Sequence, residues 1–164
     1  MILGFAHPGI VVPDLEKARA FYEKMFGFKV IANENWKNDA FYDQGTGLKN
    51  SAAKVYVLKG HNCFLELFEY TAPEQMGQPP VTLGANEMGI RHLAFYVDDI
   101  WREFYRLKSL GGIHMNEPVG NAEVGYVVYC RDPFGNIIEL TTFGGPAKPL
   151  TILEGISGLD DFEG

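Results

Sequence analysis

Cysteine is scarce in this chain of 164 residues: it occurs only as Cys63 and Cys130, which form no CxxC pair. Two cysteines this far apart do not make a disulfide framework, and both are expected to be buried free thiols. Basic residues are also in the minority, since 14 Lys and Arg stand against 21 Asp and Glu and give a net charge of −7. This balance argues against binding to a phosphate backbone, so nucleic acid is not an expected partner.

Long hydrophobic runs are absent as well. No stretch approaches the 18 or more consecutive apolar residues that a bilayer span requires, and residues 1–10 lack the basic start and apolar run of a signal peptide. We therefore expect a cytoplasmic protein with no membrane partner. The composition, with 46% hydrophobic and 21% charged residues, is that of a globular protein of one domain or of two very small modules sharing a core.

The chain contains an internal repeat. Three pairs of identical residues recur at one constant offset: His7 with His92, Asp14 with Asp99, and Gly27 with Gly112. In each copy the histidine lies in an apolar run of strand length, the aspartate is placed to cap a helix, and the glycine is placed to end that helix in the left-handed conformation. The repeat therefore spans a strand and a helix in each half of the chain.

Each half is predicted to be a βαβββ module, which makes the fold class α+β. The first strands are expected at residues 5–12 and 90–97; the later strands are expected at 28–32, 53–58 and 63–70 in the first half and at 113–118, 125–130 and 136–143 in the second. The first half is longer because of a polar insertion at 33–50. We expect a single domain at 1–143, made of module one at 1–70, a linker at 71–89 and module two at 90–143, followed by an acidic C-terminal tail at 144–164.

The repeat also aligns four residues that can bind a metal. His7 and His92 lie on the first strands, and Glu66 and Glu139 lie in matching apolar contexts on the last strands. A buried ionised glutamate is costly unless it is paired or bound to a metal. Two imidazoles and two carboxylates suit one divalent ion per site, Ni, Co, Zn, Mn or Fe, with two positions left for water or substrate. The alternative is that these are core histidines and solvent-facing glutamates.

Three motifs carry a resemblance to a known family. They are a Val-Pro-Asp-Leu-Glu-Lys-Ala helix start at 12–18, a Phe-Tyr-x-x-x-x-Gly helix end at 21–27, and Asp-Pro-x-Gly-x-x-x-Glu-Leu at 132–140. On these motifs the chain resembles the vicinal oxygen chelate superfamily over roughly residues 3 to 143. The resemblance implies paired βαβββ modules that form a curved mixed sheet around a metal site, a small-molecule substrate and a homodimer.

Ligand identity narrows what the resemblance implies. The set His7, Glu66, His92 and Glu139 is similar to that of bacterial glyoxalase I, whereas ring-cleaving dioxygenases and fosfomycin enzymes carry His, and epimerases usually Gln, where Glu66 stands. It implies a glyoxalase I-like lyase or isomerase that stabilises an enediolate by bidentate chelation of vicinal substrate oxygens, with Glu139 as the catalytic proton shuttle and Glu66 as second choice. An Fe(II) ring-cleaving dioxygenase and a non-catalytic protein that binds a drug or ligand stay open as alternatives.

The expected substrate pocket differs from that of bacterial glyoxalase I. That family typically has an Arg four residues after its first ligand and an Asn four residues after its second, whereas this chain has Val11 and Tyr70 there. Strand alternation also places Phe64 and Phe68 on the same face as Glu66. We therefore expect a less polar substrate than a glutathione adduct.

Overall fold

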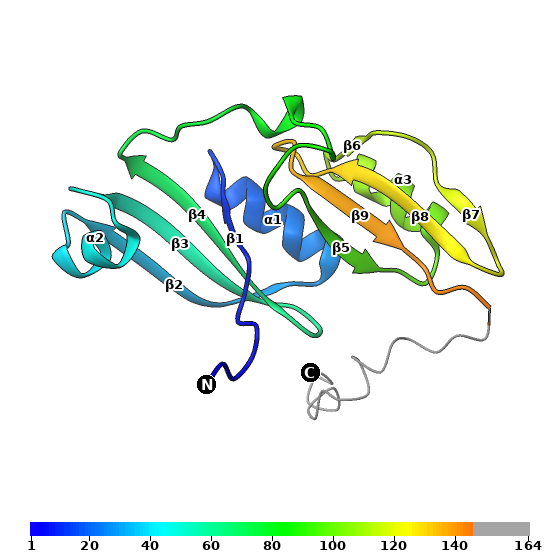
Figure 1. Ribbon diagram of the computed structural model, residues 1–164, viewed down its shortest axis with the longest axis horizontal. Helices are drawn as coiled ribbons and strands as arrows, with labels where there is room; N and C mark the ends of the chain where they lie inside the picture. The colour runs from blue at the N-terminus through cyan, green and yellow to red at the C-terminus, as the bar shows by residue number, and fades with distance from the viewer. Residues whose placement is uncertain (146–164) are drawn as a thin grey trace. The chain divides into compact units, whose positions relative to one another are not determined.

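The structure is a computed structural model that describes residues 1–145. The chain divides into two compact units, Met1–Gly77 and a second that begins at Gln78, and each is built on its own mixed sheet (Figure 1). The boundary lies inside the predicted linker, residues 71–89. The grouping of both modules into one domain at 1–143 stays a prediction, and the predicted tail, apart from residues 144 and 145, lies outside the described part of the chain.

The first unit has the order βαβ, a short helix, and ββ. Its elements are β1 (Gly9–Val11), α1 (Leu15–Phe26), β2 (Lys29–Lys37), α2 (Ala40–Thr46), β3 (Ala52–Lys59) and β4 (Phe64–Ala72). The sheet order is β1-β4-β3-β2, with β1 parallel to β4 and the other neighbours antiparallel. The first strand thus lies beside the last, which brings residues near the N-terminus next to β4.

The second unit repeats this arrangement. After a short 3-10 helix, η1 (Pro80–Thr82), it contains β5 (His92–Tyr96), α3 (Ile100–Ser109), β6 (Ile113–His114), β7 (Val119–Asn121), β8 (Gly125–Arg131) and β9 (Ile137–Thr141). The sheet order is β5-β9-β8-β6, with β7 also paired to β8 and β5 parallel to β9. The predicted α+β class with two βαβββ modules is confirmed.

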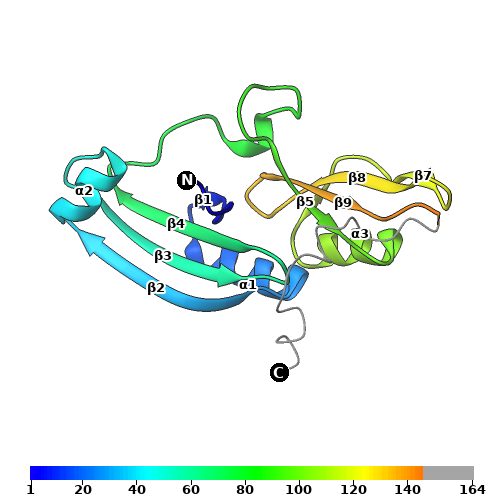
Figure 2. The ribbon, with the colours of Figure 1, turned by 60° about the horizontal axis from the view of Figure 1, so that its bottom comes forward.

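Each unit buries one face of its sheet under its own helix, as Figure 2 shows for α1 and α3. Leu65 and Leu67 of β4 are almost fully buried, as is Tyr22 of α1. In the second unit, Ile138 and Leu140 of β9 are fully buried and α3 packs against the same sheet. Because successive strand residues point to opposite faces, the residue between each apolar pair must point away from the helix.

The helix starts follow the sequence prediction. An Asp14 carboxylate oxygen accepts a hydrogen bond from the Lys17 backbone N–H at 2.9 Å, and the Asp99 carboxylate caps α3 in the same way. Gly27 ends α1 in the left-handed conformation with φ of 72°. These contacts satisfy backbone groups that a helix end leaves unpaired.

The predicted role of Gly112 is wrong. Helix α3 ends at Ser109 with Leu110 as its C-cap, and it is Gly111 that has positive φ, at 96°. A Cβ at Gly112 would lie 2.8 Å from the Arg131 carbonyl oxygen, so a glycine here permits close packing of the chain against β8. The helix therefore ends before the repeat-aligned glycine.

Several predicted strand bounds also differ from the structure. The strand expected at residues 5–12 is only Gly9–Val11, since Pro8 has no N–H to donate to a ladder and Phe5 is 85% exposed. The strand expected at 113–118 is replaced by the short β6, with β7 following it. The polar insertion contains most of β2 and all of α2, whose first turn is capped by Asp39 through a 2.8 Å bond from the Phe41 N–H.

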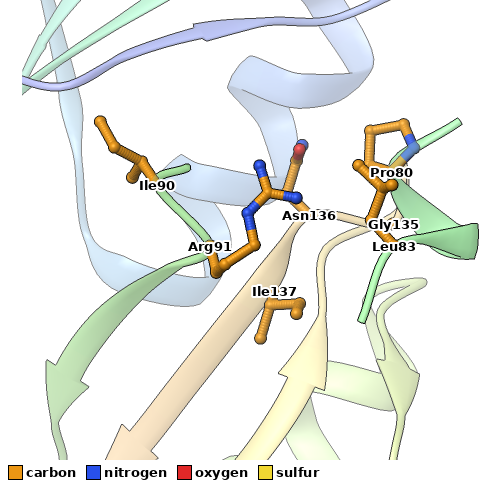
Figure 3. Close-up of a pocket in the computed structure, with 7 residues that line it drawn as sticks. All are labelled: Pro80, Leu83, Ile90, Arg91, Gly135, Asn136 and Ile137. Atoms are coloured by element: carbon orange, nitrogen blue, oxygen red, sulfur yellow. The ribbon is translucent and has the colours of Figure 1, made fainter. Parts of the chain in front are cut away.

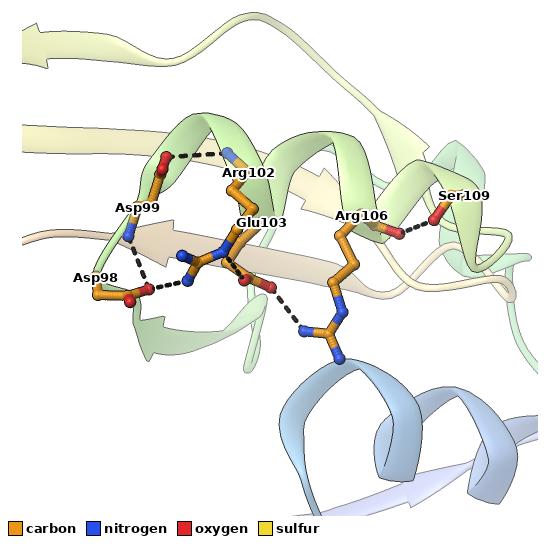
Figure 4. A network of polar contacts seen from close by, with 6 residues as sticks. All are labelled: Asp98, Asp99, Arg102, Glu103, Arg106 and Ser109. Carbon is orange, nitrogen blue, oxygen red and sulfur yellow. Dashed lines mark hydrogen bonds and ion pairs between the residues drawn. The ribbon is translucent and has the colours of Figure 1, made fainter.

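Charged side chains form a network of polar contacts along α3 (Figure 4). Arg102 contacts the Asp98 carboxylate, and its Nε lies 2.9 Å from Glu103. Arg106 contacts the other Glu103 oxygen at 2.7 Å, so two arginines bracket a glutamate that is 8% exposed. None of the helices within residues 1–145 is long and apolar enough to cross a membrane.

Candidate metal centre

The first pair of predicted ligands meets at the edge of the first sheet. Glu66 lies in β4, and its side chain points to the face opposite α1, between the buried Leu65 and Leu67. The Glu66 N–H donates to the Pro8 carbonyl at 3.1 Å, which brings the preceding residue alongside it. His7 therefore lies just before β1 rather than within it, and its Nε2 is 3.0 Å from Glu66 Oε2.

The second pair is built in the same way. His92 is the first residue of β5 and is paired with Ile137 of β9, two positions before Glu139. His92 Nε2 lies 3.1 Å from Glu139 Oε2. The histidine side chain is 36% exposed and the glutamate side chain 19% exposed, so this pair is open to a ligand from solvent.

The structure thus brings the four predicted ligands together as two pairs, His7 with Glu66 and His92 with Glu139. Within residues 1–145 no group of three or more His, Cys, Asp and Glu side chains gathers in a metal-binding arrangement. Convergence of the two pairs on one ion stays a prediction. The donor chemistry of each pair fits a divalent metal, because an imidazole nitrogen and a carboxylate oxygen lie side by side and partly exposed.

The two pairs differ in one neighbour. Tyr129 of β8 is paired with Glu139 across the two strands. Its ring centroid also lies 5.1 Å from that of His92. Burial, and after it the nearby Glu139 carboxylate, raises the pKa of Tyr129, so the phenol stays protonated and able to donate a hydrogen bond. The equivalent neighbour of Glu66 is Val57, which offers no hydrogen bond.

Tyr129 was missed in the sequence analysis, although the sequence holds a signal for it. The turn at Asp132-Pro133-Phe134-Gly135-Asn136 predicts a hairpin, and a hairpin centred there places residue 129 opposite residue 139. The pairing of residue 129 with residue 139 can therefore be predicted from the sequence once the turn is recognised. The phenol itself has no counterpart in the first half of the repeat, which is why comparison of the two halves did not reveal it.

An aromatic cluster lies on the open face of the first sheet, next to Glu66. We define it as Trp36, Tyr42, Phe68 and Tyr70. Phe68 and Tyr70 stack with ring centroids 5.9 Å apart, and Tyr70 meets Trp36 edge to face at 5.9 Å. Trp36 in turn stacks on Tyr42 of α2 at 4.3 Å. Phe68 lies on the face that was predicted, whereas the contributions of Trp36 and α2 were not foreseen.

The insertion is fixed to this cluster by polar contacts. Trp36 Nε1 donates to Ser51 Oγ at 2.8 Å, and Ser51 Oγ in turn lies 2.5 Å from the Asp43 carboxylate. Bonds from the Ser51 hydroxyl, the Ser51 N–H and the Asn50 N–H hold the pKa of Asp43 below its usual value. Helix α2 is therefore held as a wall of the open face.

The remaining histidines lie outside the two pairs. His61 is exposed in the turn between β3 and β4. The His114 ring stacks on Phe104 with centroids 3.4 Å apart, and its Nε2 lies 2.7 Å from the Phe104 carbonyl oxygen. His114 is thus a structural histidine.

The paired modules agree with a comparison against protein families. Residues 4–140 match the family model of the Glyoxalase/Bleomycin resistance protein/Dioxygenase superfamily, and the chain belongs to this superfamily. Two curated relatives are enzymes. A 2-epi-5-epi-valiolone epimerase of Actinomyces sp is 27% identical over 159 residues, covering 88% of this chain and 83% of the relative. A lactoylglutathione lyase of Schizosaccharomyces pombe is 27% identical over 145 residues, covering 83% of this chain but only 46% of the relative.

Solved structures show the same fold. A glyoxalase family protein from Bacillus cereus superposes with a TM-score of 0.80 at 22% identity, covering 88% of this chain and 97% of that one. A mutant fosfomycin resistance protein from Listeria monocytogenes, solved with Mn(II) and a dihydroxypropylphosphonic acid, superposes with a TM-score of 0.56 at 21% identity, covering 89% of this chain and 96% of that one. At these identities the likeness concerns the fold.

Proposed function

We propose that this chain is a metal-dependent lyase or isomerase that moves a proton between neighbouring carbons of a small carbonyl substrate. The observation that carries the proposal is the pair of His–Glu contacts at equivalent positions of the repeat, 3.0 Å and 3.1 Å long. Two independent structural pairs would have no reason to occur at matching places. If equivalent positions of the two modules approach a common axis, the donors to a single ion must occupy equivalent positions in the two modules, as these two pairs do.

In this proposal His7, Glu66, His92 and Glu139 together hold one divalent ion, Ni, Co, Zn, Mn or Fe. The four residues come either from one chain or from two chains of a homodimer. When bound, the ion supplies Lewis-acid stabilisation of the negative charge that develops on substrate oxygens. Both histidines must be neutral for this role, which makes loading weaker at acidic pH.

The chain's own residues supply the proton transfer. Glu139 takes the proton from the substrate carbon and returns it to the neighbouring carbon, and Glu66 is the second choice for this role. Tyr129 is a positioning residue in this proposal, since it is paired with Glu139 across β8 and β9 and its hydroxyl can donate a hydrogen bond to that carboxylate. A partly exposed glutamate of this kind has room to turn toward a substrate.

The open face of the first unit indicates the type of substrate. The aromatic cluster offers ring faces beside Glu66, and such faces pack against the apolar face of a compact small molecule. Tyr70 stands where a glutathione-specific site would need an amide. The match to the epimerase, which extends over 83% of that relative, is further support for an isomerisation of this kind.

Metal analysis tests the proposal directly. Protein purified without added metal should contain Ni, Co, Zn or Mn at about one ion per proposed site, and His92→Ala should lower that content sharply. His61→Ala is the matched control, because it removes a histidine outside both pairs. The loaded protein should also exchange carbon-bound protons of a suitable α-hydroxycarbonyl or hemithioacetal in D₂O.

Other results would select another function. Fe(II) together with substrate-dependent oxygen uptake would identify a ring-cleaving dioxygenase. Failure to bind any of the five metals, with His92→Ala and His61→Ala behaving alike, would overturn the metal centre and leave a ligand-binding protein of the same fold.

A further inference from the structure

A pocket of the second unit lies where β5 and β9 begin. It has an empty volume of about 330 Å³, open solvent included, and its polar lining comes from Arg91 and from Asn136 of the turn before β9. Pro80, Leu83 and the apolar Ile90 form other parts of its wall. Figure 3 shows the Arg91 guanidinium beside Asn136 at the start of these strands.

One wall of this pocket is fixed by a second arginine. Arg131 is 7% exposed, and its guanidinium donates to the carbonyl oxygens of Pro80 at 2.9 Å, Leu83 at 2.8 Å and Gly135 at 2.6 Å. All three of these carbonyls belong to residues that line the pocket. Arg131 therefore holds the wall in place, and among residues 1–145 no carboxylate forms an ion pair with it.

Arg91 lies in the same pocket without such bonds. Its Nε is buried and has no hydrogen-bond partner among the described residues, and the guanidinium forms no ion pair with them. A Cβ at Gly89, which has φ of 111°, would lie 3.3 Å from Arg91 Nη2, so glycine there leaves room for the guanidinium. A buried donor of a charged group without an acceptor is costly, which points to an acceptor supplied by a ligand.

The charges around the pocket favour an anion. None of the described lining residues carries a carboxylate, whereas Arg91 lines the pocket and Arg131 borders it. The nearby Asp132 carboxylate is fully buried and accepts bonds from the Phe134 N–H and from the backbone and side chain of Asn136. It is thus engaged within its own turn.

We propose that this pocket binds an oxyanion, the carboxylate or phosphate group of a small ligand, through Arg91. A planar guanidinium donates two parallel hydrogen bonds to such a group, and Asn136 lies beside it as a neutral neighbour. Arg91 directly precedes β5, and the residues that line the pocket include none of the proposed metal ligands. The proposal therefore does not depend on whether a metal is bound.

The test uses the full chain after dialysis against EDTA, so that an anion cannot bind through a metal ion. Inorganic phosphate and acetate are titrated separately while two NMR signals are followed: the Nε–Hε signal of Arg91 where that residue is present, and the side-chain amide signal of the pocket residue Asn136, which every variant retains and which gives the affinities that are compared. Arg91→Gln removes the charge, and Arg102→Gln removes an equivalent charge from the exposed side of α3 as a matched control. Far-UV circular dichroism checks that each variant is folded, and Arg91→Lys provides a second variant that keeps the charge.

We expect a saturable shift of the Arg91 signal with at least one anion, in wild type and in Arg102→Gln alike. Affinity should fall at least about tenfold in Arg91→Gln, since a bond to a charged group is lost, and less in Arg91→Lys. A response to phosphate alone or to acetate alone identifies the class of ligand. No saturable shift with either anion, or equal affinity in Arg91→Gln and wild type, would overturn the proposal, and neither result would affect the metal centre.

Discussion

Replacement of Asp132 by alanine should destabilise the second unit by about 2 to 4 kcal/mol. Asp132 is fully buried and accepts three hydrogen bonds within its turn: from the Phe134 N–H at 2.9 Å, the Asn136 N–H at 2.9 Å and the Asn136 side chain at 2.8 Å. Each donor left without an acceptor costs about 1 to 3 kcal/mol when buried. Because Phe134 and Asn136 are only half-buried, we take the lower part of that range for each bond.

Equilibrium unfolding in urea measures this loss. With a urea dependence of about 2 kcal/mol per molar, the midpoint for the second unit should fall by about 1 to 2 M. Trp101 lies in α3 of that unit and Trp36 in the first unit, so a Trp36→Phe background makes fluorescence report on the second unit. Far-UV circular dichroism follows the whole chain in parallel.

Asp99→Ala is the matched control for this experiment. Asp99 also accepts a bond from a backbone N–H, that of Arg102 at 3.0 Å, but at an exposed helix start where the loss is about 1 kcal/mol. Asp132→Asn should fall between the two, because its amide oxygen still accepts from the backbone. If Asp132→Ala cost no more than Asp99→Ala, the reasoning from buried hydrogen bonds at this turn would be refuted.

Three further predictions concern the site and the thiols. Glu139→Gln should leave the unfolding free energy within about 1 kcal/mol of wild type, since the His–Glu pair is partly exposed. It should lower turnover about 10² to 10⁴-fold, and by more than Glu66→Gln does. A near-normal rate would show that Glu139 serves only as a metal ligand. Lactoylglutathione formation from methylglyoxal and glutathione should be weak, because Tyr70, which stands where bacterial glyoxalase I typically has an Asn, is packed in the aromatic cluster. A kcat/KM in the range of about 10⁴ to 10⁸ M⁻¹s⁻¹ would contradict this. The prediction that both thiols are buried is wrong for Cys63, which is exposed because it lies in the turn between β3 and β4, and holds for Cys130. At pH 8 a thiol reagent should label Cys63 slowly and leave Cys130 unreacted until the protein unfolds, because burial raises the pKa of Cys130 to about 11. Equal labelling of both in the native protein would disprove the burial of Cys130.

The parts of the fold that the sequence predicts well are those set by local chemistry. Asp14 and Asp99 cap helices because a short carboxylate at the N-cap accepts a hydrogen bond from a free backbone N–H of the first turn. The turn from Asp132 to Asn136 follows from its Pro and Gly. Helix α2 was not foreseen, because its seven residues include a glycine and are held by contacts between Tyr42 and Trp36 that no local pattern encodes.

The candidate site was predictable only where the two halves repeat. His7, Glu66, His92 and Glu139 stand out because each has a partner at the matching position, and the structure places them as two pairs. Tyr129 and the Arg91 pocket belong to one half alone, so comparison of the halves says nothing of them. Arg131 shows the same limit, since its partners are backbone carbonyls supplied by a loop about 50 residues away.

The phenol at Tyr129 also bears on how the proposed site, built from two similar halves, could favour one orientation of a bound substrate. A site with two identical halves would accept a substrate in two orientations of equal energy and would treat its two faces alike. A hydroxyl beside Glu139 and a methyl-bearing side chain beside Glu66 remove that equivalence. One hydrogen bond to a charged group corresponds to a preference of about one to two orders of magnitude, so in the proposed site a single side chain could decide which orientation a substrate takes.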